Sequence, residues 1–131
     1  MTHKIELRVR YEETDRMGVV YYGNYLVWFE IARTEFFRAL GILYRELEEK
    51  DGLRLMVAQA ECVYRSPATY DDVVTVQTDI SEIKNSSLSF SYKVFCGARL
   101  LAAGKTSHVF TNKEGRPVRI PDGVRKAISS A

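Results

Sequence analysis

The chain has 131 residues, of which 46% are hydrophobic and 27% charged, and its formal net charge is +2. This length and composition fit one globular domain that spans residues 1–131. The small net charge argues against a nucleic-acid-binding protein, and no run of about 18 apolar residues is present that could cross a membrane. Because the N-terminal segment MTHKIELRVR lacks the apolar core of a signal peptide, we expect the protein to act in the cytoplasm.

The first half of the chain predicts one strand followed by one long helix. Residues 4–11, KIELRVRY, alternate apolar and charged side chains as a half-buried strand does. A helix is predicted from Asn24, a good N-cap residue, to about Leu40, with Gly41 as its stop signal. Apolar side chains lie on most sides of this helix, so it should be wrapped by the rest of the domain or pressed against a partner. A short helix or turn follows at residues 44–50.

The second half predicts four long strands. They cover residues 53–66, 71–83, 88–96 and 100–112, with turn signals between them. In the tail, Pro121 stands where a short terminal helix could begin. One helix followed by a run of strands predicts an α+β fold with an antiparallel sheet of about five strands. Such a sheet can curl around the long helix and leave its other face for a second subunit.

The cysteines and histidines predict structural roles. Cys62 and Cys96 are expected to be reduced thiols, since glutathione keeps such pairs open in the cytoplasm. His108 lies in the middle of a predicted strand, where a hydrogen-bonded structural role is favoured over a catalytic one. Two cysteines and two histidines this scattered predict no metal site.

The loop between the first strand and the helix carries the candidate chemistry. Asp15 lies in this loop, and Gly18 permits a backbone conformation that is denied to other residues. The helix that begins near Tyr22 to Asn24 offers unpaired backbone N–H groups and the positive end of a helix dipole. Such a terminus can hold a substrate carbonyl oxygen, while a nearby carboxylate attacks the carbonyl carbon or activates a water. An acidic residue before a helix is, by itself, more often a cap or a dipole complement, so the residues alone leave both interpretations open.

The segment YEETDRMGVVYYGNYLVWFEIARTEFFRALG, residues 11–41, resembles the signature of the 4-hydroxybenzoyl-CoA thioesterase family. It is most similar to the bacterial Tol–Pal-associated acyl-CoA thioesterase branch, and the resemblance continues through YRSPATYDDVVTV and GKTSHVFTN. The resemblance implies the hotdog fold, a curved antiparallel sheet wrapped around one long helix. It also implies a homo-oligomer, either a dimer with a continuous sheet or a tetramer of such dimers. The matching positions are, in order, Tyr11, Asp15, Gly18, Val19, Val20, Asn24 and Tyr25.

The same resemblance implies hydrolysis of an acyl-CoA thioester to a free acid and CoA, without a cofactor. Asp15 matches the catalytic carboxylate, which acts as nucleophile or general base. The backbone N–H of Tyr22 matches the group that polarises the thioester carbonyl, and Gly18 shapes the loop. Val20 and Tyr25 are assigned to substrate binding. Many members of the bacterial branch have a histidine where this chain has Tyr22, and a phenol with a pKa of about 10 cannot replace that imidazole as a base near neutral pH.

CoA carries phosphates, so a basic rim is expected where its nucleotide lies. By the resemblance, the turn at residues 82–87 matches a basic turn that contacts the nucleotide, although a solvated hairpin turn is an equal alternative. Arg65 is a second candidate for the phosphates, or it pairs with Asp71 or Asp72. The candidates for substrate binding in the turn are Lys84, Asn85, Ser86 and Ser87.

Two other functions remain compatible with the sequence. A non-catalytic acyl-binding protein would keep the fold without the chemistry. The tyrosine at position 22 and the predicted nucleotide turn, in which only Lys84 is basic, are compatible with that alternative. A thioesterase that acts on acyl carrier protein would replace the nucleotide contacts with contacts to a protein surface.

Overall fold

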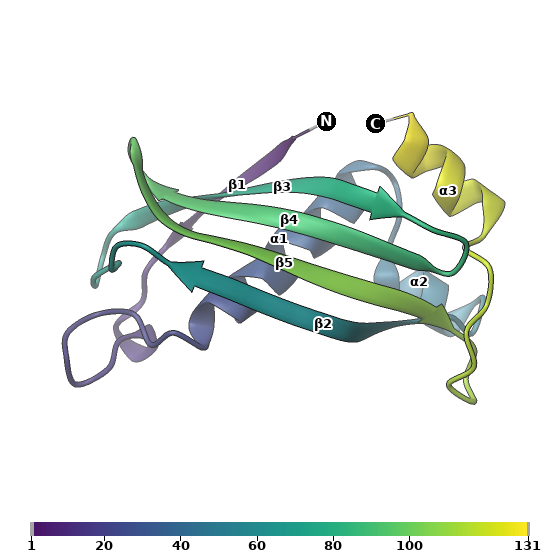
Figure 1. Cartoon of the computed structure of the whole chain (residues 1–131), viewed down its shortest axis with the longest axis horizontal. Helices are drawn as coiled ribbons and strands as arrows, with labels where there is room; N and C mark the ends of the chain where they lie inside the picture. The colour runs from purple at the N-terminus through teal and green to yellow at the C-terminus, as the bar shows by residue number, and fades with distance from the viewer. Residues whose placement is uncertain (1, 131) are drawn as a thin grey trace.

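A computed structural model describes residues 2–130, which form a five-stranded antiparallel sheet, one long helix and two shorter ones (Figure 1). All the predicted strands and helices are present, and the α+β class is confirmed. The strands are β1 (His3–Arg8), β2 (Arg54–Tyr64), β3 (Val73–Ile83), β4 (Ser87–Cys96) and β5 (Arg99–Thr111). The helices are α1 (Asn24–Ala39), α2 (Tyr44–Glu49) and α3 (Asp122–Ser129), and a 3-10 turn, η1, spans Tyr11–Glu13.

The strand order is β1-β3-β4-β5-β2, and every neighbouring pair is antiparallel. The sheet curves, and α1 lies across its inner face (Figure 1). The predicted hotdog arrangement, a curved sheet around one long helix, is therefore confirmed. Because β2 pairs only with β5 among the described residues, its other side is a free edge of the sheet. None of the helices between residues 2 and 130 combines the length and apolarity needed to span a bilayer.

The core forms between α1 and the inner face of the sheet. Phe29 is fully buried and stacks on Tyr92 of β4, with 4.2 Å between the ring centroids. Phe29 also lies directly over Gly104 of β5. A Cβ at this glycine would lie only 2.6 Å from Cζ of Phe29 and 2.7 Å from the carbonyl oxygen of Glu61. The helix can therefore approach the sheet this closely only because position 104 has no side chain.

His108 is a hydrogen-bonded core residue, as predicted. It is 1% exposed, its Nε2 lies 2.7 Å from Oγ1 of Thr106, and that oxygen lies 2.5 Å from the hydroxyl of Tyr92. Burial, reinforced by the nearby charge of Arg33, lowers the pKa of His108 to about 4. The imidazole is therefore neutral at neutral pH. Both cysteines are free thiols.

Two predictions about the N-terminal segment were wrong. β1 ends at Arg8 rather than at Tyr11, which lies in η1 and is 78% exposed. Asn24 does not cap α1, because it is the first helical residue and Gly23 occupies the N-cap position. The Asn24 side chain instead donates from Nδ2 to the carbonyl oxygen of Glu13 at 2.8 Å. Its amide group therefore ties the loop to the helix.

Candidate active site

The loop that carries Asp15 is closed by backbone pairing. Thr14 and Val20 form an isolated antiparallel bridge, and the N–H of Asp15 donates to the carbonyl of Val19 at 2.9 Å. Inside this loop the N–H of Gly18 donates to the carbonyl of Asp15 at 3.0 Å, and Gly18 has a φ of +80°. This left-handed conformation is the special backbone state predicted for Gly18, and a side chain there would strain the loop.

The carboxylate of Asp15 is half-buried and held at one oxygen. Oδ1 accepts a hydrogen bond from the backbone N–H of Met17 at 2.8 Å. This short contact orients the side chain within the loop and leaves lone pairs on Oδ2 for another partner.

A cleft of about 330 Å³ opens where α1 begins. It brings together four of the predicted residues, Asp15, Val20, Tyr22 and Tyr25, while Gly18 belongs to the loop that holds Asp15. A carboxylate, the start of a helix and an apolar wall therefore face the same space. The other lining residues are Met17, Val19, Tyr64, Arg65, Ser66 and Pro67.

Two backbone N–H groups at the start of α1 are available to bind a ligand. The carbonyls of Tyr21 and Tyr22 accept from the N–H groups of Asn24 and Tyr25, at 2.9 and 3.2 Å. In the part of the chain that the structure describes, no acceptor faces the N–H of Tyr22 or of Gly23. These two groups carry the partial positive charge of the helix terminus. They can donate to an oxygen on which negative charge develops.

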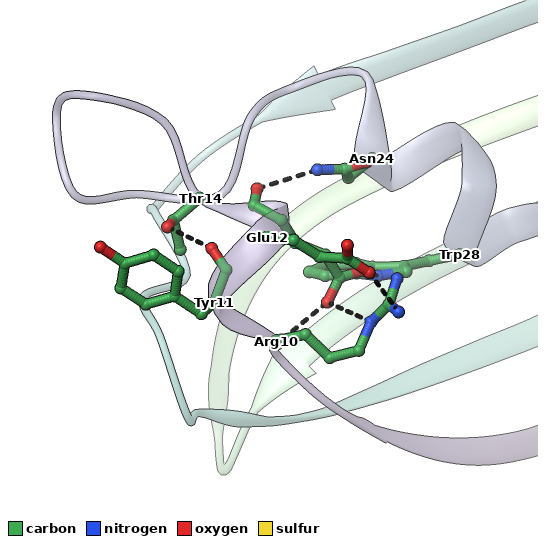
Figure 2. Close-up of polar contacts among 7 residues, drawn as sticks. Arg10, Tyr11, Glu12, Thr14, Asn24 and Trp28 are labelled. Atoms are coloured by element: carbon green, nitrogen blue, oxygen red, sulfur yellow. Dashed lines mark hydrogen bonds and ion pairs between the residues drawn. The ribbon is translucent and has the colours of Figure 1, made fainter.

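Glu13 is a buried carboxylate that fixes the loop to α1, a role that the sequence analysis did not predict. Its Oε2 accepts from Nε1 of Trp28 at 2.9 Å, and its Oε1 accepts from the backbone N–H of Arg10 at 2.8 Å. The neighbouring Glu12 is exposed and pairs with Arg10. Figure 2 shows Asn24 and Trp28 reaching from the helix toward the η1 turn. Asp15 is thus only two residues from an anchored point.

The segment after β2 supplies two further residues. Tyr64 was missed by the sequence analysis, and its hydroxyl donates to the carbonyl of Tyr22 at 2.9 Å. Arg65 lines the cleft. The alternative that Arg65 pairs with an aspartate was wrong, because Asp71 pairs with Arg8 and Asp72 accepts from the N–H of Thr69. The guanidinium group is therefore a cation at the cleft.

The predicted nucleotide turn lies elsewhere. The β3–β4 turn is at the end of the sheet opposite the loop that carries Asp15 (Figure 1). The tail of the chain holds this turn, since Arg125 donates to the carbonyl of Lys84 at 2.7 Å and the N–H of Ile120 donates to that of Asn85 at 2.9 Å. Lys84 itself pairs with Glu82 at 3.2 Å. One chain does not bring Lys84, Asn85, Ser86 and Ser87 to the cleft, so their assigned role stays a prediction that needs a second chain.

Acidic, histidine and cysteine side chains do not converge in this cleft as metal ligands would. Within residues 2–130, no group of three such side chains is close enough to hold a metal ion. The chemistry that the cleft itself offers is that of one carboxylate, Asp15, beside the helix start at Tyr22.

Comparison with known proteins identifies the family of the chain. The family model described as the thioesterase-like superfamily matches residues 9–128. An acyl-CoA thioesterase of Haemophilus influenzae is 36% identical over 124 residues, which cover 93% of this chain and 90% of that protein. The structure of a hypothetical protein from Thermus thermophilus superposes with a TM-score of 0.93 at 35% identity, over 99% of this chain and 97% of the other. The structure of a gentisyl-coenzyme A thioesterase superposes with a TM-score of 0.89 at 29% identity, over 96% of this chain and 99% of the other. The chain therefore belongs to the thioesterase-like superfamily.

Proposed function

We propose that the protein is an acyl-CoA thioesterase that hydrolyses its substrate to a free acid and CoA as a single cytoplasmic domain, without a cofactor. The observation that carries this proposal is the cleft that Asp15 shares with Tyr22, whose backbone N–H is unpaired at the start of α1. The names of the Haemophilus influenzae relative and of the gentisyl-coenzyme A enzyme support the same reaction class.

In the proposed reaction the thioester carbonyl oxygen accepts a hydrogen bond from the N–H of Tyr22. Negative charge that develops on this oxygen is stabilised by the helix terminus. The carboxylate of Asp15 then acts in one of two ways. It attacks the carbonyl carbon to form a mixed anhydride, which water hydrolyses, or it takes a proton from a water that attacks the same carbon. In either case the C–S bond breaks, and CoA leaves as a thiolate that gains a proton.

The remaining groups of the cleft bind the substrate. Val20 and Tyr25 are buried at 5% and 3% exposure and form an apolar wall beside the reacting centre. Arg65, the one cation among the lining residues of the cleft, receives a CoA phosphate. The turn residues Lys84, Asn85, Ser86 and Ser87 contact the nucleotide from a second chain.

A second chain is proposed to bind along β2. One side of this 11-residue strand pairs with β5, and the other side has unpaired backbone groups next to exposed apolar side chains such as Val57 and Val63, at 54% and 52% exposure. A long free edge of this kind favours pairing with another strand. Pairing of β2 with its copy would give a dimer with a continuous sheet. Sedimentation equilibrium should give a mass at least twice the 15.0 kDa of one chain, and a purely monomeric protein would contradict this arrangement.

The activity is tested with a panel of acyl-CoA esters and detection of the free thiol. The panel holds short, medium and long aliphatic chains together with benzoyl and hydroxybenzoyl groups. We expect release of CoA from at least one member. Tight binding of an ester without turnover of any would instead identify an acyl-binding protein. The best acyl group is then offered on acyl carrier protein, and faster hydrolysis of that form would assign the carrier protein as the substrate.

A further inference from the structure

Tyr64 connects the edge of the sheet to the first turn of α1. It is the last residue of β2, and its backbone is in register with Ala102 of β5. Its hydroxyl donates to the carbonyl of Tyr22 at 2.9 Å, and the N–H of Tyr25 donates to the same carbonyl at 3.2 Å. The peptide between Tyr22 and Gly23 is therefore held from both the strand and the helix.

The position of the Tyr64 hydroxyl is fixed by packing of its ring. The ring meets that of Tyr25 edge-on, with 5.1 Å between centroids and an interplanar angle of 85°. It meets the ring of Tyr22 in the same way at 6.3 Å and 84°. Tyr25 in turn packs against Trp28 at 4.8 Å and is 3% exposed. The rings of Tyr22 and Tyr25 thus restrict the phenol from two sides, so less entropy is lost in forming its hydrogen bond.

The hydroxyl of Tyr64 remains a donor across the useful pH range. Desolvation raises the pKa of Tyr64, and the adjacent Cys62 raises it further. The phenol is therefore protonated wherever a thioesterase would be assayed, and the hydrogen bond to Tyr22 persists.

We propose that Tyr64 is a positioning residue for thioester hydrolysis, whose hydroxyl holds the carbonyl of Tyr22 and thereby fixes the backbone of the residue whose own N–H donates to the substrate carbonyl. A peptide group is a rigid plane, so holding the carbonyl oxygen of Tyr22 also fixes the N–H of Gly23 in the same plane and restricts the backbone rotation of Tyr22 next to it. Donation to the carbonyl further polarises that N–H. Tyr64 touches no reacting atom in this scheme, and the inference rests on the proposed thioesterase function.

The first test compares Tyr64→Phe with Tyr70→Phe. The Tyr64→Phe variant keeps the ring and removes only the hydroxyl. Tyr70 is a matched control, because it is 58% exposed, packs edge-on against Tyr11 and does not line the cleft. With the best ester of the panel, kcat of Tyr64→Phe should fall roughly tenfold while KM changes less than about twofold. Tyr70→Phe should match the wild type.

A second readout separates this inference from the function on which it rests. Amide hydrogen exchange at Tyr25, whose N–H donates to the same carbonyl of Tyr22, is followed by NMR and should be faster in Tyr64→Phe than in Tyr70→Phe. If the wild type is active, any one of three results for Tyr64→Phe would overturn the role of Tyr64. These are a kcat equal to that of the wild type, an unchanged exchange rate, or a loss of activity that is expressed mainly in KM. A wild type that hydrolyses no ester overturns the thioesterase function itself, whatever the exchange rates are.

Discussion

Replacing Asp15 with asparagine should lower kcat on the best acyl-CoA substrate by about 1,000-fold or more, with little change in KM. The asparagine side chain has the same shape, and its carbonyl oxygen can still accept the hydrogen bond from the N–H of Met17, which spans 2.8 Å in the native loop. The loop should therefore keep its conformation. An amide, however, neither attacks a thioester nor takes a proton from water, so the loss falls on the chemical step. Initial rates at saturating and subsaturating ester separate the two parameters.

The matched control for Asp15→Asn is Glu12→Gln. It makes the same neutralising change three residues earlier, at an exposed carboxylate that pairs with Arg10 and does not line the cleft. Surface ion pairs of this kind contribute about 0–1 kcal/mol, so activity should stay close to that of the wild type. If Asp15→Asn and Glu12→Gln are equally active, Asp15 is a structural loop residue and not the reagent.

Replacing Gly104 with alanine should destabilise the protein by about 3 kcal/mol, the upper range for overpacking a core. The added Cβ would lie 2.6 Å from the Phe29 ring and 2.7 Å from the carbonyl oxygen of Glu61. Neither neighbour has room to move, because Phe29 is stacked on Tyr92 and the Glu61 oxygen belongs to the β2 backbone. Urea denaturation at neutral pH measures the change in the free energy of unfolding.

Gly123→Ala is the control for Gly104→Ala. Gly123 lies near the start of α3, and no heavy atom would meet a Cβ there within 4 Å. Alanine favours helix over glycine by up to about 1 kcal/mol, so this variant should be neutral or slightly more stable. A double variant that combines Gly104→Ala with Phe29→Leu should regain part of the lost stability. Equal urea midpoints for the two alanine variants would contradict the close contact between α1 and Gly104.

The strands and helices could be predicted from the sequence because their signals are local. Leu88, Phe90, Tyr92 and Val94 alternate with polar residues, and all four are buried on the inner face of β4. The stop at Gly41 could be read as well, since it has the positive φ of a residue that ends a helix. The N-terminal boundary of α1 was harder to predict from the sequence. Asn24 fits a cap by residue type, but its amide group has a partner eleven residues earlier in the chain.

The candidate site divides in the same way. Asp15, Val20, Tyr22 and Tyr25 lie within eleven consecutive positions, so one motif predicts their proximity, and the cleft contains all four. Tyr64 reaches the site from 42 residues away, which depends on β2 lying at the edge of the sheet beside β5. Strand order of this kind is set by packing of the whole domain and not by alternation within a strand. Glu13 was missed for a similar reason, because its indole partner is 15 residues further along.

The loop of Asp15 and the β3–β4 turn lie at opposite ends of the sheet, so catalysis should depend on protein concentration. If the turn contacts the nucleotide only from a second chain, the chemical step and the recognition of CoA belong to different subunits. Dilution below the dissociation constant of the oligomer would then weaken substrate affinity before it removed the reagent groups. A truncated ester that lacks the nucleotide, such as an acyl-pantetheine, would be insensitive to that loss. The association of the subunits would in this way determine how strongly the enzyme prefers CoA esters over truncated esters.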